Sequence, residues 1–113
     1  MDLGLEGATA LVTGASKGIG FACATLLAEE GCDVAINARE EERLGQAADT
    51  IARESGRRVP ALTGDMSVPD DAERVSREAI EKLGSLDILI TCAGSSPGGP
   101  PTRQPGMPAA QDA

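Results

Sequence analysis

Apolar positions along the chain follow two alternating periods up to about residue 91. Short apolar runs have the length and composition of buried strands, and they occur at residues 8–13, 33–37, 59–63 and 87–91. Between these runs apolar residues recur every three or four positions, as in amphipathic helices, at residues 18–30, 40–54 and 68–83. The pattern therefore predicts strands that alternate with helices.

Each predicted helix is expected to bury one apolar stripe and to end near a glycine. The stripes are Ile19, Ala22, Cys23, Leu26 and Leu27 in the first helix, Leu44, Ala47, Ala48 and Ile51 in the second, and Val75, Ala79, Ile80 and Leu83 in the third. Gly31, Gly56 and Gly84 stand where C-terminal glycines are common. Ser67 with Asp70 resembles a capping box at the start of the third helix, with Pro69 in its first turn.

Strands that alternate with helices through right-handed crossovers form a parallel sheet. We therefore expect an α/β fold with a Rossmann-type sheet of four strands in the order 3-2-1-4 and three helices. Three consecutive apolar residues, Ile88, Leu89 and Ile90, predict that the fourth strand is buried on both faces. That strand should be central in a complete sheet. Here the sheet is expected to be incomplete, and its exposed fourth strand favours self-association.

The composition changes after residue 94. Residues 95–113 hold five of the 7 prolines and have no periodic apolar face. Such a segment buries too little surface to offset its ordering entropy. We therefore predict a partial nucleotide-binding domain at residues 1–94 and a flexible, Pro/Gly-rich tail at residues 95–113.

Composition also limits the classes of partner. The net charge of −8 disfavours nucleic acids and anionic membranes, because both bind basic surfaces. No apolar run approaches the roughly 20 residues of a membrane span, and the first residues lack the pattern of a secretory signal.

The cysteines predict neither a metal site nor an oxidising environment. The 3 cysteines form no C-x-x-C pair and the chain has no histidine, so we predict no metal site. We also predict a cytoplasmic location, in which the thiols stay reduced. Cys23 and Cys92 are expected to be small core residues.

A glycine turn joins the first strand to the first helix, with the sequence Thr13-Gly14-Ala15-Ser16-Lys17-Gly18-Ile19-Gly20. The first backbone N–H groups of a helix have no acceptor within the helix and suit a phosphate. Glycines allow a close backbone approach, although three glycines alone could also serve packing. The flanking strand and helix favour a pyrophosphate site formed by Gly14, Ser16, Lys17, Gly18, Ile19 and Gly20.

This spacing resembles the T-G-x-x-x-G-x-G signature of the short-chain dehydrogenase/reductase family. The resemblance extends from Leu3 to about Gly99 and implies a Rossmann-type fold, use of NAD or NADP, and a homo-oligomeric parent enzyme. In the family pattern, Ala38 stands where NAD-preferring members carry Asp. Arg39 and Lys17 match positions at which NADP-preferring members carry basic residues. The resemblance therefore implies NADP, with NAD as the less favoured alternative.

Two further motifs resemble the family in the expected order. Asp65 and Met66 follow the third strand and resemble the pair that contacts adenine. Cys92, Ala93 and Gly94 resemble the end of the N-N-A-G motif, whose small residues let the cofactor approach the fourth strand. Thr91 and Cys92 replace the two Asn of that motif.

The family's acid/base residues do not follow in this chain. Members use a Tyr, a Lys and a Ser to exchange a proton while hydride passes to or from the cofactor, but this chain has no Tyr. We therefore expect no catalytic residue. The favoured interpretation is the amino-terminal cofactor half of an oxidoreductase that reduces carbonyls or oxidises alcohols, cut short or altered by a frameshift. The alternative is a non-catalytic nucleotide-binding or interaction module.

Overall fold

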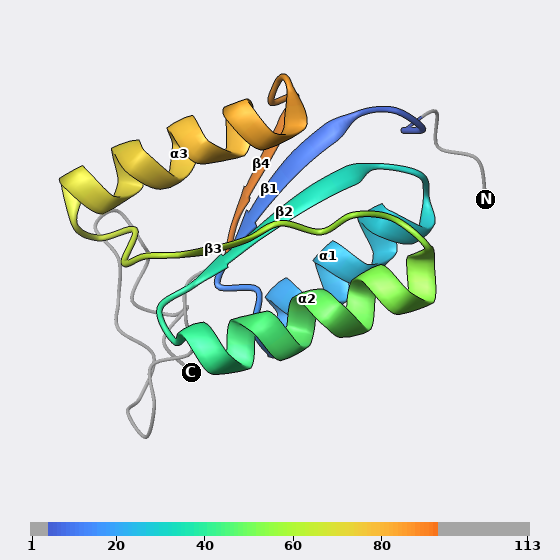
Figure 1. Cartoon of the computed structure of the whole chain (residues 1–113), viewed down its shortest axis with the longest axis horizontal. Helices are drawn as coiled ribbons and strands as arrows, with labels where there is room; N and C mark the ends of the chain where they lie inside the picture. Colours follow the sequence, from blue (N-terminus) through green and yellow to red (C-terminus); the bar gives the residue numbers. More distant parts are fainter. Residues whose placement is uncertain (1–4, 93–113) are drawn as a thin grey trace, which may run out of the picture.

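A parallel sheet of four strands lies between helices on both of its faces (Figure 1). The structure is a computed structural model that describes residues 5–92. The elements, in chain order, are β1 (Thr9–Thr13), α1 (Gly18–Glu29), β2 (Asp33–Ala38), α2 (Glu41–Ser55), β3 (Ala61–Thr63), α3 (Pro69–Leu83) and β4 (Ile88–Thr91). The strand order β3-β2-β1-β4 confirms the prediction. The predicted tail at residues 95–113 lies outside the described residues.

β1 and β2 are the best-buried strands because each has a parallel neighbour on both sides. Val12 is paired with Ile36 of β2 and with Ile90 of β4, and all five residues of β1 are buried. Figure 1 shows α3 over one face of the sheet and α1 and α2 over the other. Side chains from alternate strand positions therefore enter two separate apolar clusters, one around Val12 and Ile36 and one around Leu11 and Val75.

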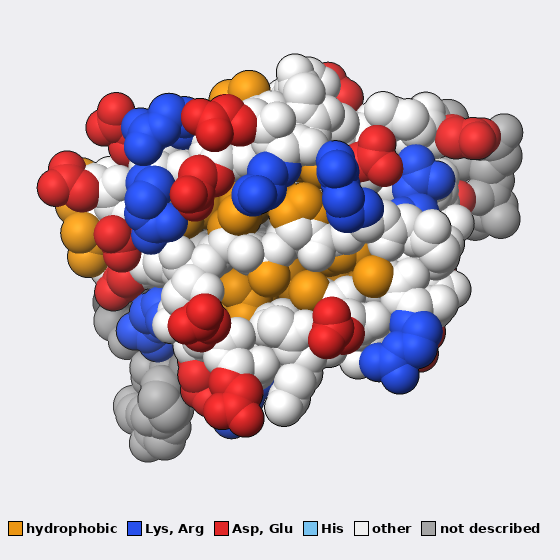
Figure 2. Space-filling view, viewed as in Figure 1, with side chains coloured by type: hydrophobic (Ala, Val, Ile, Leu, Met, Phe, Trp, Pro, Cys, Tyr) orange, Lys and Arg blue, Asp and Glu red, His pale blue; other side chains and the backbone are white. Residues whose placement is uncertain are grey.

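The outer surfaces of α2 and α3 are charged, as their amphipathic patterns predict. Figure 2 shows Lys, Arg, Asp and Glu side chains on the two helices, with a band of apolar side chains between them on the same face of the molecule. The predicted stripe of α2 is buried completely. In α3, Val75 and Ala79 are buried, but Ile80 remains 47% exposed, so the predicted stripe is wrong at that position.

The predicted stripe of α1 is wrong at Ile19, Ala22 and Leu26, although Cys23 and Leu27 do pack against the core cluster. Gly20, Ala24 and Ala28 face the sheet, whereas Ile19 and Leu26 are 77% and 54% exposed. Because α1 has apolar residues around most of its circumference, periodicity does not distinguish its faces. The smallest side chains face inward because they allow the helix backbone to approach the strand and turn before it.

The start of α3 also differs from the prediction. Val68, not Ser67, occupies the N-cap position, and the capping box is absent in this part of the described chain. The hydroxyl of Ser67 instead donates to Oδ1 of Asp65 at 2.6 Å, and the Ser67 N–H donates to the same oxygen at 3.0 Å. Ser67 thus stabilises the turn before the helix. Pro69 lies in the first turn as expected.

β4 is less buried than its apolar sequence predicts. Ile88 and Ile90 are half-buried against the cluster that includes Val12, but Leu89 on the opposite face is 55% exposed. The expectation of burial on both faces is therefore wrong for residues 5–92. The physical reason is that α3 packs across β1, β2 and β3, so it leaves the outer strand uncovered. Self-association through this edge stays a prediction.

The amino end of β4 is held to β1 by a cluster of hydrogen bonds. Oδ2 of Asp87 accepts hydrogen bonds from the backbone N–H of Thr9 at 3.0 Å and from its hydroxyl at 3.2 Å. In return, the Asp87 N–H donates to the Thr9 carbonyl at 3.0 Å. This exchange sets the register of the β1–β4 pair at the residue before β4 begins.

Candidate functional site

An open groove of about 1510 Å³ lies where the carboxyl ends of the strands meet the starts of α1 and α2. In doubly wound folds this end of the sheet is where ligands bind. The groove brings together ten of the predicted site residues: Gly14, Ser16, Lys17, Gly18, Ile19, Gly20, Arg39, Asp65, Met66 and Cys92. Ala93 and Gly94 lie outside the described residues.

The glycine turn approaches β4 so closely that a side chain at Gly14 has no room. A Cβ on Gly14 would stand 2.3 Å from the Cys92 carbonyl oxygen, and the φ of Gly14 is +63°. Gly18 has the same φ, but a Cβ there would enter open space in the groove. Packing therefore requires the first glycine, whereas backbone conformation and access to the groove require the second.

The start of α1 is open to an anion. Its N-cap residue, Lys17, makes no side-chain capping bond, and its first turn carries no acidic residue. By contrast, the first turns of α2 and α3 each carry two acidic residues. Among the described helices, α1 is thus the one whose positive end is not neutralised by its own side chains. Its amides can bind a phosphate without displacing a carboxylate.

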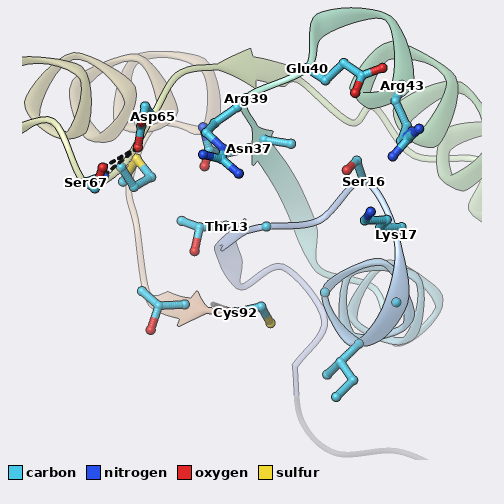
Figure 3. A pocket seen from close by; sticks show the side chains of 17 residues that line it. Thr13, Ser16, Lys17, Asn37, Arg39, Glu40, Arg43, Asp65, Ser67 and Cys92 are labelled. Carbon is cyan, nitrogen blue, oxygen red and sulfur yellow. Dashed lines mark hydrogen bonds between the residues drawn. The ribbon is translucent and has the colours of Figure 1, made fainter. Parts of the chain in front are cut away.

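Three cationic side chains line the groove from two sides. Figure 3 shows Arg43 pointing towards Ser16 and Lys17 on one side, while Arg39 lies beside Asn37 on the side of Asp65. Arg43 was missed by the sequence analysis, which considered only the first residue after β2. Its position in the first turn of the helix that follows β2 is the signal that could have identified it.

The loop after β3 presents an ionised carboxylate. The side-chain and backbone hydrogen bonds from Ser67 hold the pKa of Asp65 below its usual range, and the positive charge of Arg39 acts in the same direction. The Asp65 N–H donates to Oδ2 of Asp71 at 3.0 Å, which attaches the loop to the first turn of α3. Met66 is half-buried against the apolar cluster on the α3 face of the sheet.

Asn37 connects the two sides of the groove and was also missed by the sequence analysis. Its side chain is 2% exposed, and its Nδ2 donates to the carbonyls of Leu62 at 2.8 Å and Gly64 at 3.1 Å. Its backbone carbonyl accepts a hydrogen bond from the Ala15 N–H at 3.0 Å. The signal in the sequence was a polar residue within an otherwise apolar strand.

Cys92 forms the end of the groove beside the glycine turn. Its N–H donates to the Thr13 carbonyl at 3.3 Å, so the β1–β4 pairing continues to this residue. Burial, followed by the neighbouring Cys23 thiol, raises the pKa of Cys92. The described residues contain no cluster of three His, Cys, Asp or Glu side chains able to hold a metal ion.

A smaller hollow of about 320 Å³ lies at the other end of the sheet and is lined by Arg58, Pro60, Glu81 and Lys82. Arg58 donates from Nη2 to the Lys82 carbonyl at 2.7 Å, where α3 ends. This contact stabilises the end of a helix. None of the predicted site residues lines this hollow, so the larger groove is the candidate site.

The family model described as short chain dehydrogenase matches residues 8–107. The chain belongs to the short-chain dehydrogenase family. The resemblance inferred from the glycine turn is thereby confirmed, as is the assignment to a family of oxidoreductases. No helix within residues 5–92 is long and apolar enough to cross a membrane.

Relatives in the short-chain dehydrogenase family include several sugar dehydrogenases. The chain is 46% identical over 88 residues to a glucose 1-dehydrogenase of Gluconobacter oxydans, covering 78% of this chain and 33% of that protein. It is 40% identical to an L-rhamnose 1-dehydrogenase (NAD(P)(+)) of a Sphingomonas species, covering 82% of this chain and 37% of that protein. The chain thus spans about a third of the length of these relatives.

Solved structures of this family share the fold. L-sorbose reductase from Gluconobacter frateurii, in complex with NADPH and L-sorbose, has a TM-score of 0.82 and 32% identity, covering 99% of this chain and 42% of the reductase. A short-chain alcohol dehydrogenase from Sinorhizobium meliloti has a TM-score of 0.71 and 46% identity, covering 78% of this chain and 34% of that one.

Proposed function

We propose that this chain is the cofactor-binding part of a short-chain oxidoreductase and that it prefers NADP to NAD. The observation that carries the proposal is the set of three cations, Lys17, Arg39 and Arg43, around a groove that begins at the uncapped end of α1. Such a groove suits an elongated ligand with separate anionic groups, as a dinucleotide phosphate has.

The glycine turn would hold the pyrophosphate. The first amides of α1, from Gly18 to Gly20, supply donors and the positive end of the helix dipole, and the hydroxyl of Ser16 supplies another donor. Gly18 leaves the space that the phosphate oxygens would occupy. When bound, the nicotinamide of the cofactor donates or accepts hydride.

The 2′-phosphate would lie between the two cationic sides of the groove. Lys17 and Arg43 would approach it from the side of the glycine turn, and Arg39 from the end of β2. Ala38, the last residue of β2, offers no carboxylate to accept the ribose 2′-hydroxyl of NAD. Glu40 also lines the groove, and Figure 3 shows its carboxylate next to Arg43. The NADPH bound to L-sorbose reductase supports the same cofactor for this chain.

Asp65 and Met66 would contact adenine. Asp65 is ionised and held by its turn, so its carboxylate can accept a hydrogen bond from the adenine amino group. Met66 offers a polarisable side chain next to the ring. Cys92, Ala93 and Gly94 would form the end of the groove that the nicotinamide half approaches. These roles follow from the motifs and from the position of Asp65, Met66 and Cys92 along one groove.

The parent enzyme would reduce a carbonyl or oxidise an alcohol by hydride transfer. We propose that the 113-residue chain binds the cofactor without catalysing this reaction, because it contains no Tyr to exchange the proton. The division into a domain at residues 1–94 and a tail at residues 95–113 belongs to the same proposal. So does a cytoplasmic location, where the thiols of Cys23, Cys32 and Cys92 would remain reduced.

The test measures binding of NADP⁺ and NAD⁺ to the 113-residue chain by isothermal titration calorimetry. Because a charge-assisted hydrogen bond contributes about 1.5–3 kcal/mol, NADP⁺ should bind about tenfold to a hundredfold more tightly than NAD⁺. The fragments 2′,5′-ADP and 5′-AMP should differ in the same direction, since they differ only in the 2′-phosphate. Equal affinities for the two cofactors would contradict the preference for NADP.

Single variants test the three cations. Lys17→Ala, Arg39→Ala and Arg43→Ala should each weaken NADP⁺ binding by about tenfold and change NAD⁺ binding far less. Arg53→Ala is the matched control, because Arg53 is an exposed cation in the last turn of α2 and does not line the groove. A loss in the control as large as in the three variants would show that only net charge matters.

A separate assay tests the absence of catalysis. The pure 113-residue chain is incubated with NADPH and a panel of ketones and sugars, and NADPH oxidation is followed by absorbance. No oxidation above the protein-free rate is expected. A turnover that depends on the ketone would overturn this part of the proposal while leaving the assignment of the groove intact.

A further inference from the structure

The loop that carries Asp65 and Met66 is held by a helix that does not reach the groove. Within residues 5–92, no residue of α3 lines the groove, whereas Asp65, Met66 and Ser67 do. The first two turns of α3 nevertheless pack directly against the loop that precedes them. These contacts determine how the loop between β3 and α3 presents its side chains.

The peptide group between Gly64 and Asp65 is bonded on both of its sides. Its carbonyl oxygen, on Gly64, accepts a hydrogen bond from Nδ2 of Asn37 at 3.1 Å. Its N–H, on Asp65, donates to Oδ2 of Asp71 at 3.0 Å. Asn37 belongs to β2 and Asp71 to the first turn of α3, so two separate elements fix the plane of one peptide group. The direction in which the Asp65 side chain leaves the backbone depends on this plane.

Arg74 holds the residue that precedes this peptide group. Its Nη2 donates to the Thr63 carbonyl at 2.9 Å and lies 3.8 Å from Oδ1 of Asp71. A Cβ on Gly64 would stand 2.9 Å from Cγ2 of Val75 and 3.0 Å from Nη2 of Arg74. The loop is therefore in direct contact with α3, and it cannot move towards the helix.

We propose that Asp71 is a positioning residue for base recognition: by holding the Asp65 N–H, it orients the Asp65 carboxylate towards the adenine amino group. This rests on the proposed function, in which that carboxylate accepts a hydrogen bond from adenine. Ser67 fixes the carboxylate within its own turn (Figure 3), whereas Asp71 fixes the turn relative to the rest of the fold. Adenine has an amino donor at C6 and hypoxanthine has an oxygen acceptor there, so a carboxylate held at this position distinguishes the two bases.

The alternative is that Asp71 acts only through its charge. Asp70 and Asp71 both lie in the first turn of α3, where a carboxylate interacts favourably with the helix dipole. Asp70 is exposed and Asp71 is half-buried. Three substitutions separate the two roles. Asp71→Ala removes the bond and the charge, Asp71→Asn removes the charge but keeps an oxygen that can accept the Asp65 N–H, and Asp70→Ala removes a charge from the same turn without touching that bond.

The experiment measures, by isothermal titration calorimetry, how tightly the 113-residue chain binds NADP⁺, NAD⁺ and the NADP⁺ analogue that has hypoxanthine in place of adenine. The wild-type chain should bind NADP⁺ about tenfold to a hundredfold more tightly than the analogue, because one charge-assisted hydrogen bond is lost. In Asp71→Ala this preference should fall by about threefold to tenfold, since NADP⁺ must then order the loop itself. The preference for NADP⁺ over NAD⁺ should stay within about twofold of the wild-type value, because the cations of the groove lie outside α3.

The two control variants, Asp71→Asn and Asp70→Ala, should keep the wild-type preference for adenine. An unchanged preference in Asp71→Ala, or an equal loss in either control, would overturn the proposal. So would a parallel loss of the preference for NADP⁺ over NAD⁺, because a general loosening of the groove would lower both preferences. If Asp71→Ala does not fold, Asp71→Ser replaces it, since the serine oxygen lies one bond closer to the backbone.

A measurement without any cofactor separates this proposal from the proposed function. If the wild-type chain binds NADP⁺ no more tightly than NAD⁺, the assignment of NADP fails. Amide hydrogen exchange of the cofactor-free chain still tests the positioning role. The Asp65 N–H should exchange about tenfold faster in Asp71→Ala than in the wild-type chain and in Asp71→Asn. Unchanged exchange in Asp71→Ala would overturn the role of Asp71 even if NADP⁺ binds as expected.

Discussion

Gly20 of α1 faces the carbonyl oxygen of Gly14, and a Cβ added to Gly20 would stand 2.2 Å from that oxygen. No side chain fits at this distance without movement of the backbone. The contact explains why α1 turns its smallest residues towards the sheet and exposes Ile19. It also places the first amides of the helix directly over the end of β1.

The first prediction concerns this contact. Gly20→Ala should lower the free energy of unfolding by about 1–3 kcal/mol, because the added methyl group displaces α1 from the glycine turn. Gly45→Ala is the control, since Gly45 lies within α2 and a Cβ there meets no atom within 4 Å. Alanine should stabilise that helix by up to about 1 kcal/mol. Urea unfolding of both variants measures the difference, and equal effects would contradict the close contact.

The second prediction concerns Asn37. Asn37→Ala removes the hydrogen bonds from Nδ2 to the carbonyls of Leu62 and Gly64, which are buried. We expect a loss of about 2–3 kcal/mol in the free energy of unfolding, because two bonds are lost and a buried polar group is left unpaired. Thr50→Ala also removes one side-chain bond, to the Gln46 carbonyl, but on the exposed surface of α2. Its effect should stay below about 0.5 kcal/mol.

The third prediction concerns the titration of Asp65. Its lowered pKa means that its hydrogen bonds stabilise the folded protein above the carboxyl pKa of the unfolded chain, about 3.9, and that this contribution is lost as the pH falls through the folded pKa. Ser67→Ala removes the hydroxyl that is the largest cause of the shift and should raise the pKa of Asp65. A carboxyl-carbon NMR titration measures it directly. Ser76→Ala, in α3, should leave the Asp65 titration unchanged.

The fourth prediction concerns the attachment of β4. Asp87→Ala removes the carboxylate that accepts two hydrogen bonds from Thr9 and should destabilise the fold by about 1 kcal/mol, a value reduced by the exposure of Asp87. The N–H of Thr9 should also exchange faster with solvent. Asp49→Ala removes an exposed carboxylate from α2 and serves as the control. Unchanged exchange at Thr9 in Asp87→Ala would show that the carboxylate does not hold the strand.

The order of strands and helices was predictable because it depends on periodicity and on glycines at their ends. The αL conformations of Gly56 and Gly84, with φ of +74° and +87°, follow from the same local rules. The groove was predictable because each of its motifs directly follows a strand of a parallel sheet. Local sequence was therefore sufficient to predict the topology, and it placed the motifs at the end of the sheet where the groove lies.

The features that were missed depend on contacts between distant segments. Periodicity in α1 did not show that Gly20 must meet Gly14, so the buried face was assigned to larger side chains. The apolar sequence of β4 did not show that α3 leaves Leu89 uncovered. Arg43 was missed because its approach to Ser16 and Lys17 depends on how α2 is placed against α1.

Asn37 has one more consequence, for the dynamics of the groove. Its carbonyl accepts a hydrogen bond from the Ala15 amide in the glycine turn, and its side chain donates to the carbonyls of Leu62 and Gly64 on the side of β3. Neither the glycine turn nor the end of β3 can move outward while Asn37 keeps both sets of hydrogen bonds. We expect the amide protons of Ala15 and Gly64 to exchange at matching rates, as members of one cooperative opening unit. A ligand that binds to one side of the groove would then slow amide proton exchange on both sides.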